Sequence, residues 1–200
     1  DRVAAACRAG LDAGADPVAF TRGLALASRD ADELGRWLAD GRTDHDVALD
    51  PHLRWRVVQR LALLGALDAD MIDDERRRDG TADADLGAAT ALAARPSAEA
   101  KEEAWAALRA EDVSNRLFTA ITRGLWPAEH AALAAPYLPR YLEEGPRWAE
   151  RGPAFSQVVG HGFPAFHLDE AQLDQLREAL AGDVPTVLRR HWQDVLDDRS

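Results

Sequence analysis

The sequence contains few of the residues that build β-sheets. Valine and isoleucine number only 11 and 2 among 200 residues, whereas alanine and leucine number 40 and 25. Alanine and leucine lose little freedom on entering a helix, and β-branched residues prefer strands. Apolar residues recur at spacings of three and four along most of the chain, and strict alternation is absent. The sequence therefore predicts an all-helical fold without strands of consequence.

Cysteine and lysine are also scarce, and acidic residues outnumber basic ones. The single cysteine, Cys7, excludes an internal disulfide framework, and one thiol cannot hold a zinc ion. The formal net charge is −11, and Lys101 is the only lysine. Nucleic acids and anionic membranes attract proteins with an excess of basic residues, so we expect neither as a partner. No apolar run reaches the length of about 18 residues that a membrane span needs. We expect a cytoplasmic protein.

The residues that hold metals or carry out catalysis do not form a recognisable arrangement. None of the six histidines has another histidine three or four positions away, the spacing that lets one helix face bind a metal. His45 and His52 lie on either side of Pro51, and His161 and His167 flank a predicted helix end. We interpret these histidines as loop or surface residues. We therefore expect no metal, no cofactor and no catalytic residue in this chain.

Capping residues mark the ends of the predicted helices. Asp50 precedes a helix that Gly65 closes, and Asp169 is followed by Gln172 in the spacing of a capping box. Further helices are predicted after Ser97, Ser114 and Asp183, and near residues 1–13, 17–28, 30–39, 69–79, 84–94, 128–150 and 153–162. Pro136, Pro139 and Pro146 should divide the stretch 128–150 into two or three pieces.

The spacing of these elements indicates a repetitive architecture. Each helix with its loop takes roughly 16 to 22 residues, so that two units approach the 40-residue period of HEAT-like repeats. We expect an irregular superhelical, HEAT-like array of roughly ten to twelve short antiparallel helices. Residues 1–200 should form one helical domain, and the polar loop at 40–50 is the most favourable point for a subdivision. The six tryptophans and Cys7 should pack in the core or between helices.

Several strings occur in an order that is typical of one family. Residues 49–56 read Leu-Asp-Pro-His-Leu-Arg-Trp-Arg and lead to Leu-Ala-Leu-Leu-Gly at 61–65. Further strings are Pro-Ser-Ala-Glu-Ala-Lys at 96–101, Gly-Leu-Trp at 124–126, Pro-Tyr-Leu-Pro-Arg-Tyr at 136–141 and Trp-Ala-Glu-Arg at 148–151. The ordered set resembles the C-terminal helical domain of bacterial aminopeptidase N, a zinc metallopeptidase of the gluzincin type. The endoplasmic-reticulum aminopeptidases have the same domain.

The resemblance implies a non-catalytic role. The His-Glu-x-x-His and Gly-x-Met-Glu-Asn motifs of the family are absent from this sequence. In the family they lie upstream, in a separate catalytic domain that holds zinc. Because the chain begins in mid-pattern at Asp1, we expect a C-terminal fragment of a longer zinc aminopeptidase. By resemblance, its partner is the catalytic domain of its own parent chain, which it covers, thereby limiting which peptides reach the zinc.

Two arginines are the candidate substrate-binding residues. In some relatives, basic residues of this domain meet the C-terminal carboxylate of the peptide substrate. Arg116 and Arg123 follow Ser114 on one predicted helix, and a guanidinium matches a carboxylate in geometry. The alternative interpretation is that both are ordinary surface arginines. A different function, a stand-alone helical scaffold for a protein partner, needs only the predicted array.

The first predicted helix carries an apolar stripe formed by Val3, Cys7 and Leu11. Because this stripe starts at the beginning of the chain, we expect the parent chain to cover part of it. Surfaces of this kind are more apolar than the average surface of a monomer.

Overall fold

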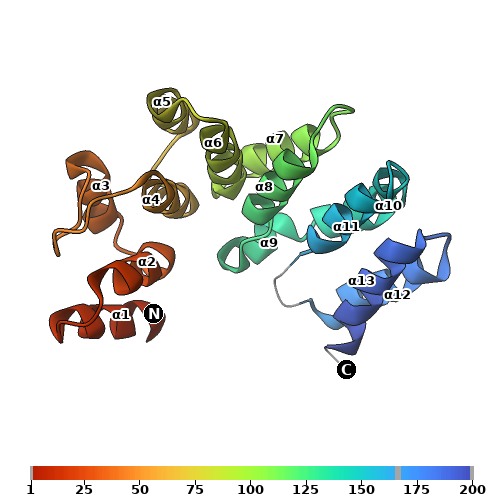
Figure 1. Ribbon diagram of the computed structural model, residues 1–200. Coiled ribbons are helices and arrows are strands. Elements are labelled where there is room, and N and C mark those ends of the chain that lie inside the picture. Colours follow the sequence, from red (N-terminus) through yellow and green to blue (C-terminus); the bar gives the residue numbers. More distant parts are fainter. Residues whose placement is uncertain (1, 165–167, 199–200) are drawn as a thin grey trace. The chain divides into compact units, whose positions relative to one another are not determined.

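The chain folds into α-helices joined by short loops (Figure 1). The computed structural model describes residues 2–164 and 168–198, and these ranges contain thirteen α-helices, one short 3-10 helix and no strand. One isolated antiparallel bridge joins Arg42 to Ala48. The predicted all-helical class is confirmed. Among the helices of these ranges, none has the length and apolar character needed to cross a membrane.

The contacts between helices divide the chain into two units, residues 1–96 and 97–200. The division lies outside the loop at 40–50, because α4 packs on both α2 and α3 across that loop. The single domain expected for residues 1–200 stays a prediction. The first unit contains α1 (Arg2–Asp12), α2 (Pro17–Ala27), α3 (Ala31–Asp40), α4 (Pro51–Leu63), α5 (Ala69–Asp79) and α6 (Ala82–Ala94). The second contains α7 (Ala98–Leu108), α8 (Asn115–Leu125), the 3-10 helix η1 (Ala128–His130), α9 (Ala131–Ala134), α10 (Tyr137–Ala149), α11 (Pro153–His161), α12 (Glu170–Ala181) and α13 (Thr186–Asp197).

Within each unit the helices pack in alternation. In the first unit α2, α4 and α6 contact one another in succession, and α1, α3 and α5 each pack on the following helix of that series. In the second unit α8, α11 and α13 form a similar series, on which α7, α10 and α12 pack. Stacked helix pairs produce this alternation, because each pair buries its apolar face on its neighbours. The superhelical, HEAT-like form of the array stays a prediction.

The capping residues read from the sequence set most helix starts. The side chains of Asp50, Ser97 and Ser114 each accept a hydrogen bond from the backbone N–H three residues further on. Asp169 and Gln172 form the complete capping box, with both hydrogen bonds at 2.9 Å. Each side chain satisfies a backbone donor that has no partner inside the helix.

One predicted cap is wrong, whereas the stretch 128–150 does consist of three pieces, η1, α9 and α10. Asp183 does not cap α13, because Pro185 disfavours helical geometry in the residue before it and the helix starts after this proline. Pro136 separates α9 from α10, but Pro139 and Pro146 lie inside α10. Pro139 sits in the first turn, where a backbone N–H has no intrahelical partner in any case. Pro146 sacrifices one helix hydrogen bond, and the buried residues around it keep α10 continuous.

Aromatic side chains dominate the core of the second unit. All six tryptophans and Cys7 are buried, which confirms their predicted place in the core. The fully buried Tyr141 donates a hydrogen bond to the carbonyl oxygen of Val159 at 2.7 Å. Its ring contacts five further aromatic rings, those of Trp105, Phe118, Trp126, Trp148 and Phe163.

Candidate functional site

Helix α8 presents both arginines that the sequence singled out. Its buried side, which includes Phe118, Ile121 and Leu125, packs into the core of the second unit. Arg116 and Arg123 are exposed. They are seven residues apart, so they lie on the same side of the helix and roughly 10 Å apart along its axis.

The exposed side of α8 is basic. We call it the basic face of α8 and define it by Arg116, Thr119 and Arg123. The helix contains no acidic residue, although the whole chain has a net charge of −11. Arg123 makes no ion pair with any residue that the structure describes. By contrast, Arg140 in the same unit is paired with Glu102 at 2.7 Å. The basic face of α8 therefore offers a guanidinium to an external carboxylate.

A buried lysine contacts the C-terminal end of α8. The side chain of Lys101, on α7, is fully buried, and its Nζ atom lies 3.3 Å from the carbonyl oxygen of Gly124. The next residue but one, Trp126, donates from Nε1 to the carbonyl oxygen of Gly162 at 2.9 Å. These two bonds fix the end of α8 that carries Arg123, and the ammonium matches the negative end of the helix dipole.

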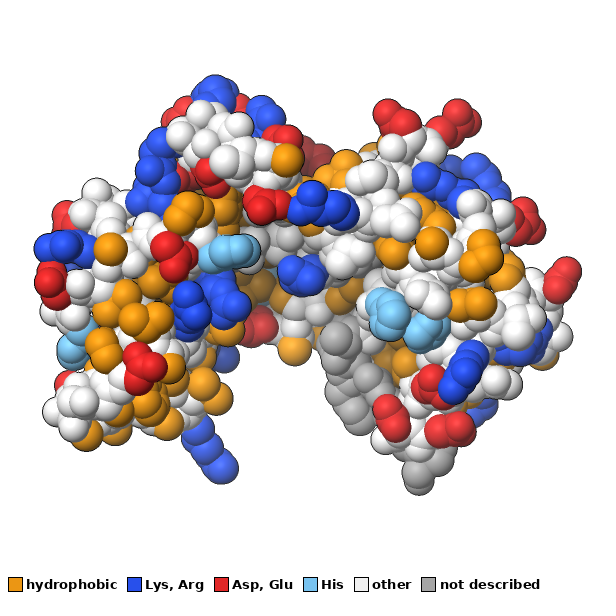
Figure 2. Space-filling model, in the orientation of Figure 1, with side chains coloured by type: hydrophobic (Ala, Val, Ile, Leu, Met, Phe, Trp, Pro, Cys, Tyr) orange, Lys and Arg blue, Asp and Glu red, His pale blue; other side chains and the backbone are white. Residues whose placement is uncertain are grey.

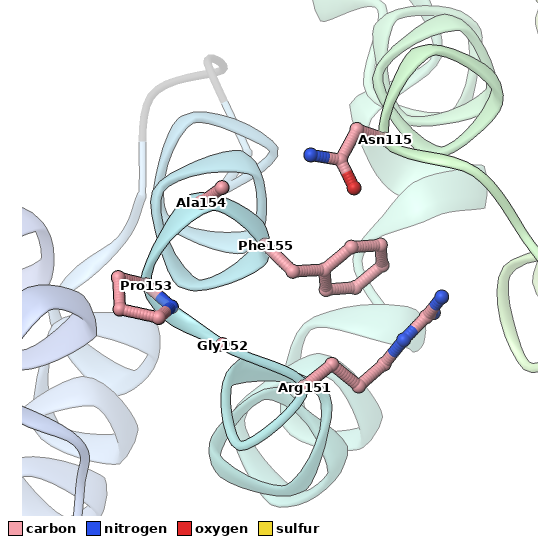
Figure 3. Close-up of a pocket in the computed structure, with 6 residues that line it drawn as sticks. All are labelled: Asn115, Arg151, Gly152, Pro153, Ala154 and Phe155. Atoms are coloured by element: carbon pink, nitrogen blue, oxygen red, sulfur yellow. The ribbon is translucent and has the colours of Figure 1, made fainter.

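An open hollow of about 360 Å³ adjoins the start of α8 (Figure 3). Asn115 of α8 and residues 151–155 at the junction of α10 and α11 line it. The guanidinium of Arg151 lies 3.8 Å from the ring centre of Phe155 and donates to the carbonyl oxygen of Val113 at 2.8 Å. Gly152 permits the sharp junction with a φ of 131°. Sequence analysis missed this hollow, because a Gly-Pro pair signals a turn and says nothing of what packs against it.

The structure brings together two histidines that are distant in the sequence. His161 ends α11 and His191 lies on α13, with ring centres 4.5 Å apart in an edge-to-face contact. His45 and His52 are exposed, as predicted, and His167 lies outside the described residues. The described residues contain no group of three or more side chains placed to hold a metal ion.

Comparison with known proteins decides the family. Residues 5–199 match the model of the ERAP1-like C-terminal domain. The chain belongs to this family. An aminopeptidase N from Streptomyces lividans is 34% identical over 186 residues, which cover 90% of this chain and 22% of that protein. The chain thus spans about a fifth of the length of this relative. The resemblance inferred from the ordered strings is confirmed.

Membership of the ERAP1-like C-terminal domain family does not by itself assign the arginines. The structure places Arg116 and Arg123 on the predicted helix after Ser114, and both are exposed. It also shows Asn115 and Arg151 beside the start of the same helix, which the sequence did not suggest. The role of Arg116 and Arg123 in binding stays a prediction.

Proposed function

We propose that this chain is the non-catalytic C-terminal domain of a zinc aminopeptidase, which covers the catalytic domain of its parent chain and controls which peptides reach the zinc. The observation that carries the proposal is the 34% identity with an aminopeptidase N over 90% of the chain. The zinc-binding motif His-Glu-x-x-His is absent from these 200 residues, so zinc and peptide cleavage are assigned to the rest of the parent chain. The cytoplasmic location stays a prediction.

The basic face of α8 supports a direct role in handling peptides. A peptide whose N-terminus lies at a distant zinc site presents its C-terminal carboxylate away from that site. An exposed arginine on a helix without acids suits such a carboxylate, because a guanidinium donates two parallel hydrogen bonds to it. Short substrates do not reach α8, so this contact would favour longer peptides.

Exposed apolar side chains on α1 and α2 support a covered surface. Val3 is 60% exposed and Leu26 is 55% exposed, whereas Cys7 and Leu11 are buried. Cys7 lies against Gly23, and the short α1–α2 turn makes the two helices antiparallel, so Val3 lies near the level of Leu26. Figure 2 shows hydrophobic side chains gathered over these helices. An apolar surface of this kind fits a contact with the remainder of the parent chain.

The test combines this chain with the separately expressed remainder of its parent. We expect the two to associate and the combination to cleave long peptides with an altered length preference. Arg116→Glu and Arg123→Glu should weaken cleavage of long peptides more than cleavage of a single aminoacyl anilide, which is too short to reach α8. Arg147→Glu is the matched control, because Arg147 is exposed on α10 and the charge change is the same.

Two outcomes would contradict the proposal. One is the absence of association at micromolar concentrations. The other is an equal effect of the α8 variants on long peptides and on the anilide, with far-ultraviolet circular dichroism confirming that the variants are folded. Either result favours the alternative, a stand-alone helical scaffold that binds a protein partner.

A further inference from the structure

We infer that His161 and His191 form a binding site for a divalent transition-metal ion, with water completing the coordination. The two rings come from α11 and α13, which pack against each other, and their centres are 4.5 Å apart. Two imidazoles that bind one ion through nitrogen, each at about 2.0–2.1 Å, place their ring centres roughly 4.5–6 Å apart, depending on the angle at the ion. The observed separation of the ring centres falls within this range.

The two histidines differ in freedom. The ring of His191 lies directly against the backbone of Gly160 on α11, where any side chain at position 160 would overlap it. This contact limits the movement of His191. His161 is exposed at the end of α11, so its ring is able to rotate toward an ion held by His191. One fixed ligand and one adjustable ligand therefore face each other across two packed helices.

The ligand type indicates which ions bind. Imidazole suits Cu²⁺, Ni²⁺ and Zn²⁺, and affinity for a given nitrogen site is highest for Cu²⁺ in this series. Two protein ligands hold an ion less tightly than the four ligands of structural zinc sites. Sequence analysis predicted no metal here, because 30 residues separate the two histidines along the chain. The inference does not depend on the proposed function.

The experiment titrates the 200-residue chain with Cu²⁺ or Zn²⁺ alone, using calorimetry and, for Cu²⁺, electron paramagnetic resonance. We expect one ion per chain and a copper spectrum showing two imidazole nitrogens. His161→Ala should weaken binding by roughly tenfold or more, because the second imidazole adds its bond within the same molecule. His52→Ala is the matched control, since His52 is exposed and stands alone on α4.

Stability gives a second measurement. Zn²⁺ should raise the midpoint of thermal unfolding of the unaltered chain and of His52→Ala, and should leave that of His161→Ala nearly unchanged. The exposed His161 is the primary substitution because the half-buried His191 also contributes to packing. Binding of either ion with equal affinity to the unaltered chain and to folded His161→Ala would overturn the inference. So would the absence of binding at millimolar metal.

Discussion

The ammonium group of Lys101 lies 3.3 Å from the carbonyl oxygen of Gly124, at the end of α8. The last carbonyls of a helix lack intrahelical partners and carry the negative end of its dipole. Lys101, the only lysine of the chain, is buried and contacts the C-terminal end of α8. A contact from α7 therefore fixes the end of the helix that carries the basic face of α8.

Replacing Lys101 should destabilise the second unit. Lys101→Met keeps most of the buried volume but leaves the Gly124 carbonyl without this donor, and should lower the free energy of unfolding by about 1–2 kcal/mol. Lys101→Ala also opens a cavity and should cost about 2–4 kcal/mol. Urea denaturation followed by circular dichroism measures both, with Glu103→Ala, exposed on α7, as the control. A Lys101→Met chain as stable as the unaltered one would contradict this prediction and show that removal of the buried charge offsets the lost hydrogen bond.

His191 should make stability depend on pH between neutrality and mild acid. Burial, and then the charge of His161, place its folded pKa below the value of 6.5 expected in the unfolded chain. As the pH falls through 6.5, the unfolded chain takes up a proton at this position before the folded chain does, so the free energy of unfolding decreases. Urea denaturation between pH 7.5 and 5.5 should show this decrease, and His191→Gln should flatten it. An unchanged pH dependence in folded His191→Gln would assign the effect to other groups.

Arg140 should control the ionisation of Glu102. Arg140 donates to both Glu102 carboxylate oxygens at 2.7 and 3.0 Å, Tyr137 donates to one of them, and together they lower the pKa of Glu102 to about 2. The guanidinium also lies 4.8 Å from the ring centre of Trp105. Lysine in Arg140→Lys cannot make the two parallel hydrogen bonds to Glu102 or stack its charged group on the Trp105 ring in the same way. The pKa of Glu102 measured by NMR should therefore rise toward 4.5. The Glu102 side chain is 57% exposed, so the loss of stability should stay below about 1 kcal/mol.

The control for this measurement is Arg147→Lys, which alters another exposed arginine of α10. It should leave the pKa of Glu102 near 2. A Glu102 carboxyl that titrates near 4.5 in the unaltered chain would contradict the proposed effect of Arg140 on its pKa. Because the folded pKa is the lower one, any stability that Glu102 contributes is present above pH 4.5 and is lost as the pH falls toward 2.

Two helical glycines should respond in opposite directions to alanine. A side chain at Gly87 would overlap the ring of Trp55, which is held by a hydrogen bond from Nε1 to Asp79 at 2.7 Å. Gly87→Ala should therefore destabilise the first unit by about 1–3 kcal/mol. Gly35 on α3 has open space around it, so Gly35→Ala should stabilise the chain by about 0.5–1 kcal/mol. Thermal unfolding measures both effects. A Gly87→Ala chain as stable as Gly35→Ala would contradict the close contact between Gly87 and the Trp55 ring.

The sequence by itself determined the helical class and most helix boundaries. Asp50, Ser97 and Ser114 cap their helices as predicted, because a cap involves only the three residues that follow it. The shared face of Arg116 and Arg123 follows from the helical period alone. The same local reasoning failed where two local preferences compete. It misplaced the start of α13 and overestimated the breaking effect of prolines within α10.

Only the tertiary structure decided which distant residues meet. The contact of Lys101 with Gly124 depends on the packing of α7 on α8. The meeting of His161 with His191 likewise depends on the packing of α11 on α13. Helix formation is governed by hydrogen bonds and caps within about four residues. Which helices pack together is decided by the burial of whole apolar faces, a non-directional effect that one short segment of sequence does not encode.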